Sequence, residues 1–203
     1  NSIINTASTI TVNSGGALDW QQTGAETLAG ITINGTGINN LGALTQTTAA
    51  TGGAITGAVT LGSHSTIGVA SGGRIALVTA LVNASSTLTK DGAGELRSTL
   101  NNGTPFGVSN FVLNGGTLAL VPGTGAASAA TGMNTAVGST FTYGGTGMGG
   151  GGNLTLTKNT TFGLTLTIGN AGATANTVLV RSSRGTLVIQ PTLITALGNA
   201  TAA

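Results

Sequence analysis

Few side chains in this 203-residue chain could do acid–base chemistry. His64 is the only histidine, and it stands between two serines in Ser63-His64-Ser65. A histidine beside a serine can act as a general base for a nucleophile. No carboxylate lies near it in the sequence to orient the imidazole ring. We therefore expect His64 to be an exposed histidine in a turn, with no catalytic role.

The other candidate is a cluster of four charged residues, Lys90, Asp91, Glu95 and Arg97. Enzymes that cleave polysaccharides use clustered acids and bases on one sheet, so this cluster is where such chemistry would reside. Lys90 and Asp91 flank a turn, and Glu95 and Arg97 point to one face of one strand. We interpret the group as surface ion pairs, each worth well under ~1 kcal/mol. The sequence thus predicts no catalytic residues and no enzyme.

Metal and cofactor sites are also not predicted. The chain has no cysteine, which excludes a thiolate metal site and a disulfide framework. Calcium-binding nonapeptides need aspartates among their glycines, and those aspartates do not occur here. The glycines at 150–152 do not precede a helix, so they form no phosphate-binding loop. We expect no metal and no cofactor.

Pairs of threonines separated by one residue could form a binding surface. On a flat sheet, stacked Thr-x-Thr pairs would make ranks that bind ice or glycans, but threonine is also a common outward-facing strand residue. The pairs do not recur at every repeat, so we favour the second interpretation. An ice-binding or glycan-binding module remains an alternative. The pairs are Thr9-Thr11, Thr87-Thr89, Thr140-Thr142, Thr155-Thr157 and Thr165-Thr167.

Composition narrows the class of protein. Charged residues make up 5% of the chain and the net charge is +2, which is too little and too scattered for a nucleic-acid surface. No apolar run approaches the ~18 residues of a membrane-spanning helix. Apolar residues are 39% of the chain. A chain this apolar and this poor in charge is expected to fold as β-sheet rather than remain disordered.

The elements that must carry these residues are short strands. Apolar residues alternate with polar ones throughout, and no segment shows a helical period. The stretch from Leu88 to Leu120 runs strand, turn, strand, loop, strand, turn, strand, and we take it as the repeat unit. Marks of glycine followed by small and apolar residues recur, and those at 53, 73, 94 and 116 lie 20 to 22 residues apart.

This repeat unit resembles a known family. The order LTKDGAGEL, an Asn-rich loop and then FVLNGGTLAL is similar to the autotransporter-associated β-strand repeat of bacterial passenger domains, with Glu95 in place of the usual threonine. The resemblance implies a secreted or surface-exposed protein, exported by an autotransporter, on the outer membrane or outside the cell.

We predict an all-β chain, a right-handed parallel β-helix of about 7–9 coils, with a β-sandwich as the alternative. Residues 1–203 would form one solenoid domain from a longer repeat chain, with insertion loops near 123–132 and 144–152. Its function would be structural, as a stalk, fibre segment or adhesin scaffold; a carbohydrate-acting enzyme is a further alternative. Its partners would be further coils of the same chain, identical copies stacked end to end, or host or matrix surfaces. We also expect Phe141 and Phe162 to stack in neighbouring coils.

Overall fold

The computed structural model describes residues 8–22, 25–26, 29–49, 51–79, 81–82, 85–100, 110–122, 140–145, 151–157, 179–182 and 185–191. Within them lie seventeen strands and one short 3₁₀ helix. The elements are β1 (Thr9–Val12), β2 (Leu18–Asp19), β3 (Ala25–Glu26), β4 (Gly30–Gly35), η1 (Ile38–Asn40), β5 (Leu44–Gln46), β6 (Thr51–Ile55), β7 (Ala58–Val69), β8 (Arg74–Leu77), β9 (Leu81–Val82), β10 (Thr87–Asp91), β11 (Glu95–Leu100), β12 (Asn110–Leu113), β13 (Gly116–Pro122), β14 (Thr140–Tyr143), β15 (Gly152–Leu156), β16 (Leu179–Arg181) and β17 (Leu187–Pro191).

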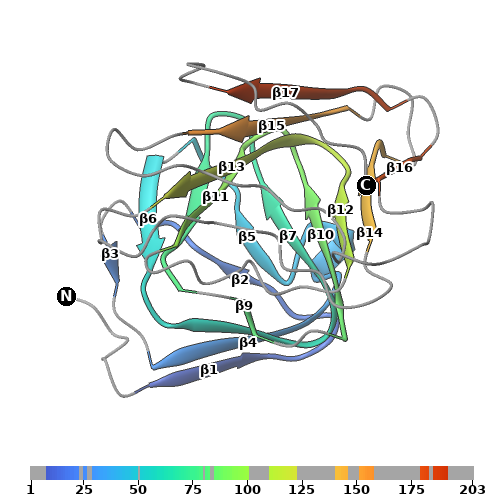
Figure 1. Ribbon diagram of the computed structural model, residues 1–203. Helices are drawn as coiled ribbons and strands as arrows, with labels where there is room; N and C mark the ends of the chain where they lie inside the picture. The colour runs from blue at the N-terminus through green and yellow to red at the C-terminus, as the bar shows by residue number, and fades with distance from the viewer. Residues whose placement is uncertain are drawn as a thin grey trace.

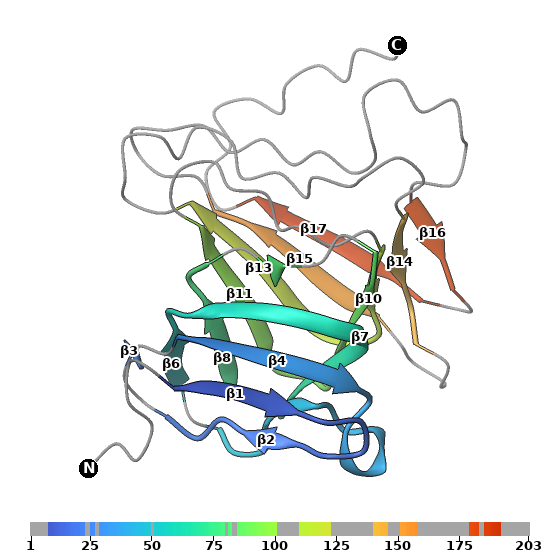
Figure 2. The same cartoon turned by 90° about the horizontal axis from the view of Figure 1, so that it is seen from below.

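The strands form two sheets whose described pairings are all parallel. The ten-stranded sheet runs β1-β4-β7-β10-β12-β14-β16, with β2, β5 and β9 beside this path. The seven-stranded sheet runs β17-β15-β13-β11-β8-β6-β3. From β10 to β17 the chain alternates between the sheets and adds a parallel strand at each pass, and within both sheets the strands stack in chain order (Figure 2). A β-sandwich is built from antiparallel strands, whereas the described strands pair in parallel, which does not fit the β-sandwich alternative.

The longest strand joins two parts of the ten-stranded sheet. The first half of β7 pairs with β4 and β9, and its second half pairs with β5 and β10. Between the halves, residues 62–64 are exposed. The sequence suggests two separate strands here, Val59–Leu61 and Thr66–Val69, whereas the structure continues one strand through the corner.

Side chains of the period-2 pattern stack in columns inside the molecule. In β10 and β12 every second side chain is buried, as the alternation predicts. Stacking equivalent residues at about 4.8 Å removes both from water, and this burial is the main stabilising term. The sheets surround this apolar interior (Figure 1). One column consists of Ile75, Leu96, Leu118, Leu154 and Ile189.

The glycine marks fall into register at the start of the seven-stranded sheet. Gly116 pairs with Gly152, and a Cβ on Gly116 would overlap the carbonyl oxygen of Gly94 in the turn stacked against it. Only glycine fits where one backbone turn lies directly on the next. Gly53 does not belong to this column, because a register shift in β6 pairs it with Ile75.

Phe141 points inward as predicted, but its neighbours differ from the expected one. It is fully buried and stacks on Phe111, with ring centroids 5.5 Å apart and planes 19° apart. In the sheet its register partners are Phe111 and Leu179. Phe162 lies outside the described residues. A fixed 21-residue step fails here because long connections separate β12, β14 and β16.

The predicted insertion loops are described only in part. The segment 123–132 lies outside the described residues, as does 146–150. At the ends of the second loop, Gly144, Gly145 and Gly152 are buried and Gly152 already belongs to β15.

Candidate functional site

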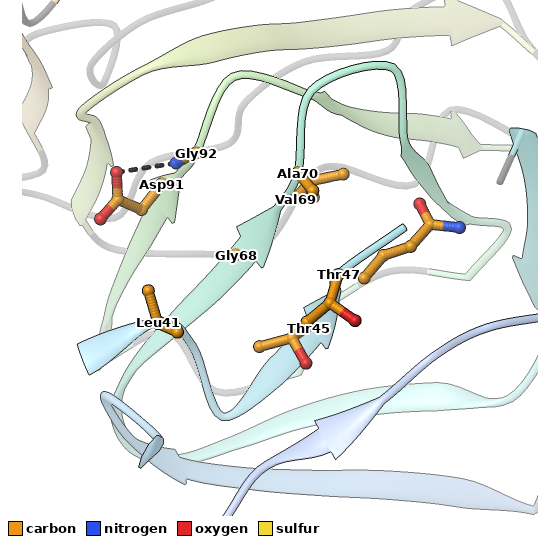
Figure 3. Close-up of a pocket in the computed structure, with 9 residues that line it drawn as sticks. Leu41, Thr45, Thr47, Gly68, Val69, Ala70, Asp91 and Gly92 are labelled. Carbon is orange, nitrogen blue, oxygen red and sulfur yellow. Dashed lines mark hydrogen bonds between the residues drawn. The ribbon is translucent and has the colours of Figure 1, made fainter. Parts of the chain in front are cut away.

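A hollow of about 330 Å³ opens on the outer side of the ten-stranded sheet, where an outward-facing column loses a side chain. Asp19, Thr45, Gly68 and Asp91 are successive register partners on β2, β5, β7 and β10. A Cβ on Gly68 would overlap the carbonyl oxygen of Leu41, so the backbone of Leu41 fills the place of a side chain there, and the hollow lies beside it. The exposed Leu41, which follows η1, borders it (Figure 3).

Asp19 lies outside the hollow, but its carboxylate fixes one residue of the lining, Thr47, by hydrogen bonds. Asp19 Oδ2 accepts from the hydroxyl of Thr47 at 2.6 Å and from the amide nitrogen of Gln21 at 2.6 Å, and Oδ1 accepts from the Thr47 backbone N–H at 3.1 Å. Partial burial acts to raise the pKa of Asp19, but these hydrogen bonds outweigh it and lower the pKa below its usual value. Asp19 thus fixes Thr47 and is not poised to accept a proton at neutral pH.

Asp91 lines the opposite side of the hollow. Its Oδ1 accepts from the backbone N–H of Gly92 at 2.7 Å, a contact that closes the turn after β10 (Figure 3). Asp19 and Asp91 stand three strand spacings apart in the column, which is about 14 Å at ~4.8 Å per strand. Paired carboxylates of glycosidases stand about 5–9.5 Å apart. The two acids therefore cannot act together on one glycosidic bond.

Lys90 is not a surface residue. The prediction that Lys90, Asp91, Glu95 and Arg97 form surface ion pairs is therefore wrong for Lys90. Its side chain is fully buried, at 0% exposure. Leu88 and Lys90 share the inward face of β10, and Lys90 lies in register between Ile67 and Leu113. A charged residue thus stands between two buried apolar residues of its column.

Backbone carbonyl oxygens compensate this buried charge. The Lys90 Nζ donates to the carbonyl oxygens of Asp91 at 2.7 Å, Gly92 at 2.7 Å and Gly115 at 3.2 Å. An ammonium has three donors and no acceptor, so all of its hydrogens are used. Asp91 is the last residue of β10 and Gly92 begins the turn after it, whereas Gly115 belongs to the turn after β12. Lys90 therefore ties two successive turns together from inside.

The environment of Lys90 also changes its protonation. Burial lowers the pKa of Lys90 to about 8, and the Asp91 carboxylate opposes this effect. The side chain remains protonated at pH 7. Lys90 lines neither of the two hollows found among the described residues. Its geometry is that of a structural tie rather than of a catalytic base.

Glu95 and Arg97 behave as the sequence predicts. Arg97 Nε donates to Glu95 Oε1 at 2.7 Å, and the two side chains are 27% and 33% exposed. They lie two residues apart on the outward face of β11. An ion pair this accessible to water contributes little to stability.

His64 is exposed, as expected, although it belongs to the corner of β7 rather than to a turn. Its Nδ1 accepts a hydrogen bond from the backbone N–H of Thr87 at 2.9 Å. That bond fixes the ring against β10. Ser63 and Ser65 donate their hydroxyl hydrogens to backbone carbonyl oxygens, so neither is arranged as a nucleophile for His64.

The Thr-x-Thr pairs face outward but do not stack on one another in the described sheets. Thr9 and Thr11 pair with Gly30 and Thr32, and Thr155 pairs with Ala119 and Gln190. The other two described pairs are separated by β12, which presents Asn110 and Val112 between them. Asn110 Oδ1 accepts from the hydroxyl and the backbone N–H of Thr140 at 2.9 and 3.1 Å. Thr165-Thr167 lies outside the described residues.

No group of three or more His, Cys, Asp or Glu that could hold a metal ion occurs in the part of the chain that the structure describes. Among the same residues, no helix is long and apolar enough to cross a membrane. Comparisons with protein-family models, with curated proteins and with solved structures find no match for this chain.

Sequence reasoning missed the hollow and the inward lysine for different reasons. The hollow depends on the register of β2, β5, β7 and β10, which no local pattern reveals. Lys90 could have been found, because the alternation that buries Leu88 also buries the second residue after it. The general preference of lysine for the surface argued against that placement.

Proposed function

We propose that this chain is a segment of a non-enzymatic β-solenoid that serves as a stalk, fibre segment or adhesin scaffold on a bacterial surface or in a secreted protein. We infer about seven coils by taking one strand of the seven-stranded sheet per coil, which would give a rod of roughly 35 Å at ~4.8 Å per coil. We infer a right-handed helix, because crossovers between parallel strands are right-handed in about 98% of cases. The repeat's resemblance to autotransporter passengers supports export.

One observation carries this proposal: the internal columns continue to the last described strands without a terminating polar layer. Leu179 and Ile189 end two columns on β16 and β17, and they are 49% and 51% exposed. Soluble solenoids usually end in atypical polar repeats. Among the described strands, none pairs with the far edges of β16 and β17, and an open strand edge invites another strand. Further coils of a longer chain, or a second copy, would cover it.

The test is sedimentation of the isolated 203-residue chain at micromolar concentration, with negative-stain microscopy of the products. We expect self-association into short rods. Ile189→Lys should weaken it by placing a charge at the column end. Leu41→Lys is the matched control, because Leu41 is 62% exposed but lies away from the ends of the columns. A wild-type chain that stays monomeric and dispersed for days would refute the proposal that the ends are covered.

A glycan-binding module is the second candidate, and the hollow at Gly68 is the observation that favours it. Its lining combines an aliphatic side chain, Leu41, with Thr45, Thr47 and the carboxylate of Asp91. Apolar surface with a few polar groups is typical of ligand sites. The polar groups of this hollow already bond within the protein, which leaves the scaffold as the better supported function.

A further inference from the structure

A second hollow, of about 250 Å³, opens on the outer face of the seven-stranded sheet. Arg74, Glu95 and Thr117 line it as successive register partners on β8, β11 and β13. Glycines and one alanine of the turns before β8 and β11 form the rest of its wall. These small residues keep the polar side chains accessible from outside.

The hollow carries an unbalanced positive charge. Glu95 is engaged by Arg97, and in the described residues this is the single ion pair. Arg74 stands in register beside Glu95 but donates no hydrogen bond to it, and its Nε is buried without a partner. The donors of Arg74 that a ligand can reach are therefore the terminal Nη groups. Arg74 and Arg97 together exceed Glu95 by one positive charge.

Arg74 has the chemistry of a carboxylate receptor. A guanidinium presents its donors in a planar fork that matches a carboxylate, and such charge-assisted bonds are stronger than neutral ones. The Thr117 hydroxyl, one strand beyond Glu95, can donate to or accept from a neighbouring ligand hydroxyl. The space is below the 300–1,000 Å³ usual for drug-sized ligands, so it suits a ligand of about one sugar ring.

We propose that the Arg74 hollow binds the carboxylate of a uronic acid residue, as found in acidic polysaccharides. This inference goes beyond the scaffold function, which requires no ligand. It makes the outer face of the seven-stranded sheet a recognition surface, with Arg74 as the anchoring residue and Thr117 as a positioning residue. In the described strands, the register column of Arg74 and Glu95 contains no second arginine. At the same position, β13, β15 and β17 carry Thr117, Asn153 and Val188.

The experiment is a titration of the ¹⁵N-labelled Ile189→Lys chain, in which self-association should be weakened, with sodium D-galacturonate at constant ionic strength, followed by amide NMR shifts. We expect saturable shifts at the amides of Gly73, Gly94 and Thr117, with weaker binding by sodium acetate and none by D-galactose. Arg74→Gln should weaken galacturonate binding about tenfold or more, because a charge-assisted bond is lost. Arg181→Gln, a change at an exposed arginine on the other sheet, should leave it unchanged.

Three results would overturn the proposal. The first is the lack of saturable shifts in the dispersed Ile189→Lys chain, and the second is equal binding when Arg74→Gln is added to it. The third is acetate binding as tightly as galacturonate, which would show that no sugar ring is recognised. Fluorescence of Trp20, the only tryptophan and 2% exposed, verifies that each variant is folded. Self-association of the chain is measured separately, so failure here leaves the scaffold proposal standing.

Discussion

The buried lysine makes the most informative prediction about stability. Replacing Lys90 with methionine keeps the length of the side chain but removes the ammonium. The carbonyl oxygens of Asp91, Gly92 and Gly115 then lose their donor. We expect Lys90→Met to destabilise the fold at pH 7, because two stacked turns would no longer be tied together.

The magnitude follows from two opposing contributions. Each hydrogen bond from a charged donor contributes about 1.5–3 kcal/mol, so three contribute roughly 4–9 kcal/mol. Against this stands the cost of burying the ammonium: a pKa near 8 instead of 10.5 corresponds to about 3 kcal/mol. The turn around Gly92 is exposed, so water would replace part of what the carbonyls lose. The difference between the two contributions is roughly 1–6 kcal/mol, and because water replaces part of the loss, the expected net destabilisation is about 2 kcal/mol.

The assay is urea unfolding at pH 7, followed by Trp20 fluorescence and by far-UV circular dichroism. A loss of about 2 kcal/mol corresponds to a fall in Tm of about 4–8 °C for a chain of this size. Arg181→Met is the matched control: Arg181 is exposed and lies in the same register column as Lys90, two strands beyond Leu113. It should change stability by less than about 0.5 kcal/mol. A Lys90→Met chain as stable as the wild type would refute the reasoning and would show that the desolvation cost dominates, as in some buried ion pairs.

Three further predictions concern protonation, core packing and inertness. The pKa of Lys90 is lowered from 10.5 to about 8, so between these pH values the unfolded chain binds more protons than the folded one. Stability against unfolding should therefore rise as the pH increases from 8 to 10.5, which the pH dependence of the urea midpoint measures. An equal rise in the Lys90→Met variant would assign the effect to other groups. Ser98 is fully buried and its hydroxyl has no hydrogen-bond partner. Ser98→Ala should therefore stabilise the chain by about 1 kcal/mol in the same unfolding assay. A loss of stability would contradict this and would indicate that the hydroxyl forms a hydrogen bond in the folded chain. We expect His64→Ala, and loss of the carboxylates of Asp91 and Glu95, to leave any activity of the intact assembly unchanged; a polysaccharide-cleaving activity that disappears with any of them would favour an enzyme instead.

The sequence by itself determined the class of fold and its repeat unit. The period-2 alternation between Leu88 and Leu120 predicted the strands now seen as β10, β11, β12 and β13, with boundaries within two residues. This succeeds because side-chain direction in a strand is a local property of the backbone. The regular spacing of Gly94 and Gly116 also marked the turns in the sequence. Glycine is required at these positions because only glycine permits the turns to stack so closely.

The tertiary structure decided which residues lie beside one another. Phe141 stacks on Phe111 and pairs with Leu179, because connections of unequal length separate the strands that become neighbours. Pairing in a parallel sheet is non-local, so spacing along the chain does not determine it when the connections vary.

The same holds for the placement of charge. Lys90 is buried because the carbonyl oxygen of Gly115, from the following turn, completes the set of three acceptors that its ammonium needs. The hollow at Gly68 forms where four strands bring Asp19, Thr45 and Asp91 into one column and the backbone of Leu41 passes close to the glycine among them. Sequence shows the residue types, but only the register of stacked strands determines which polar groups meet, and hence which charges the interior can hold.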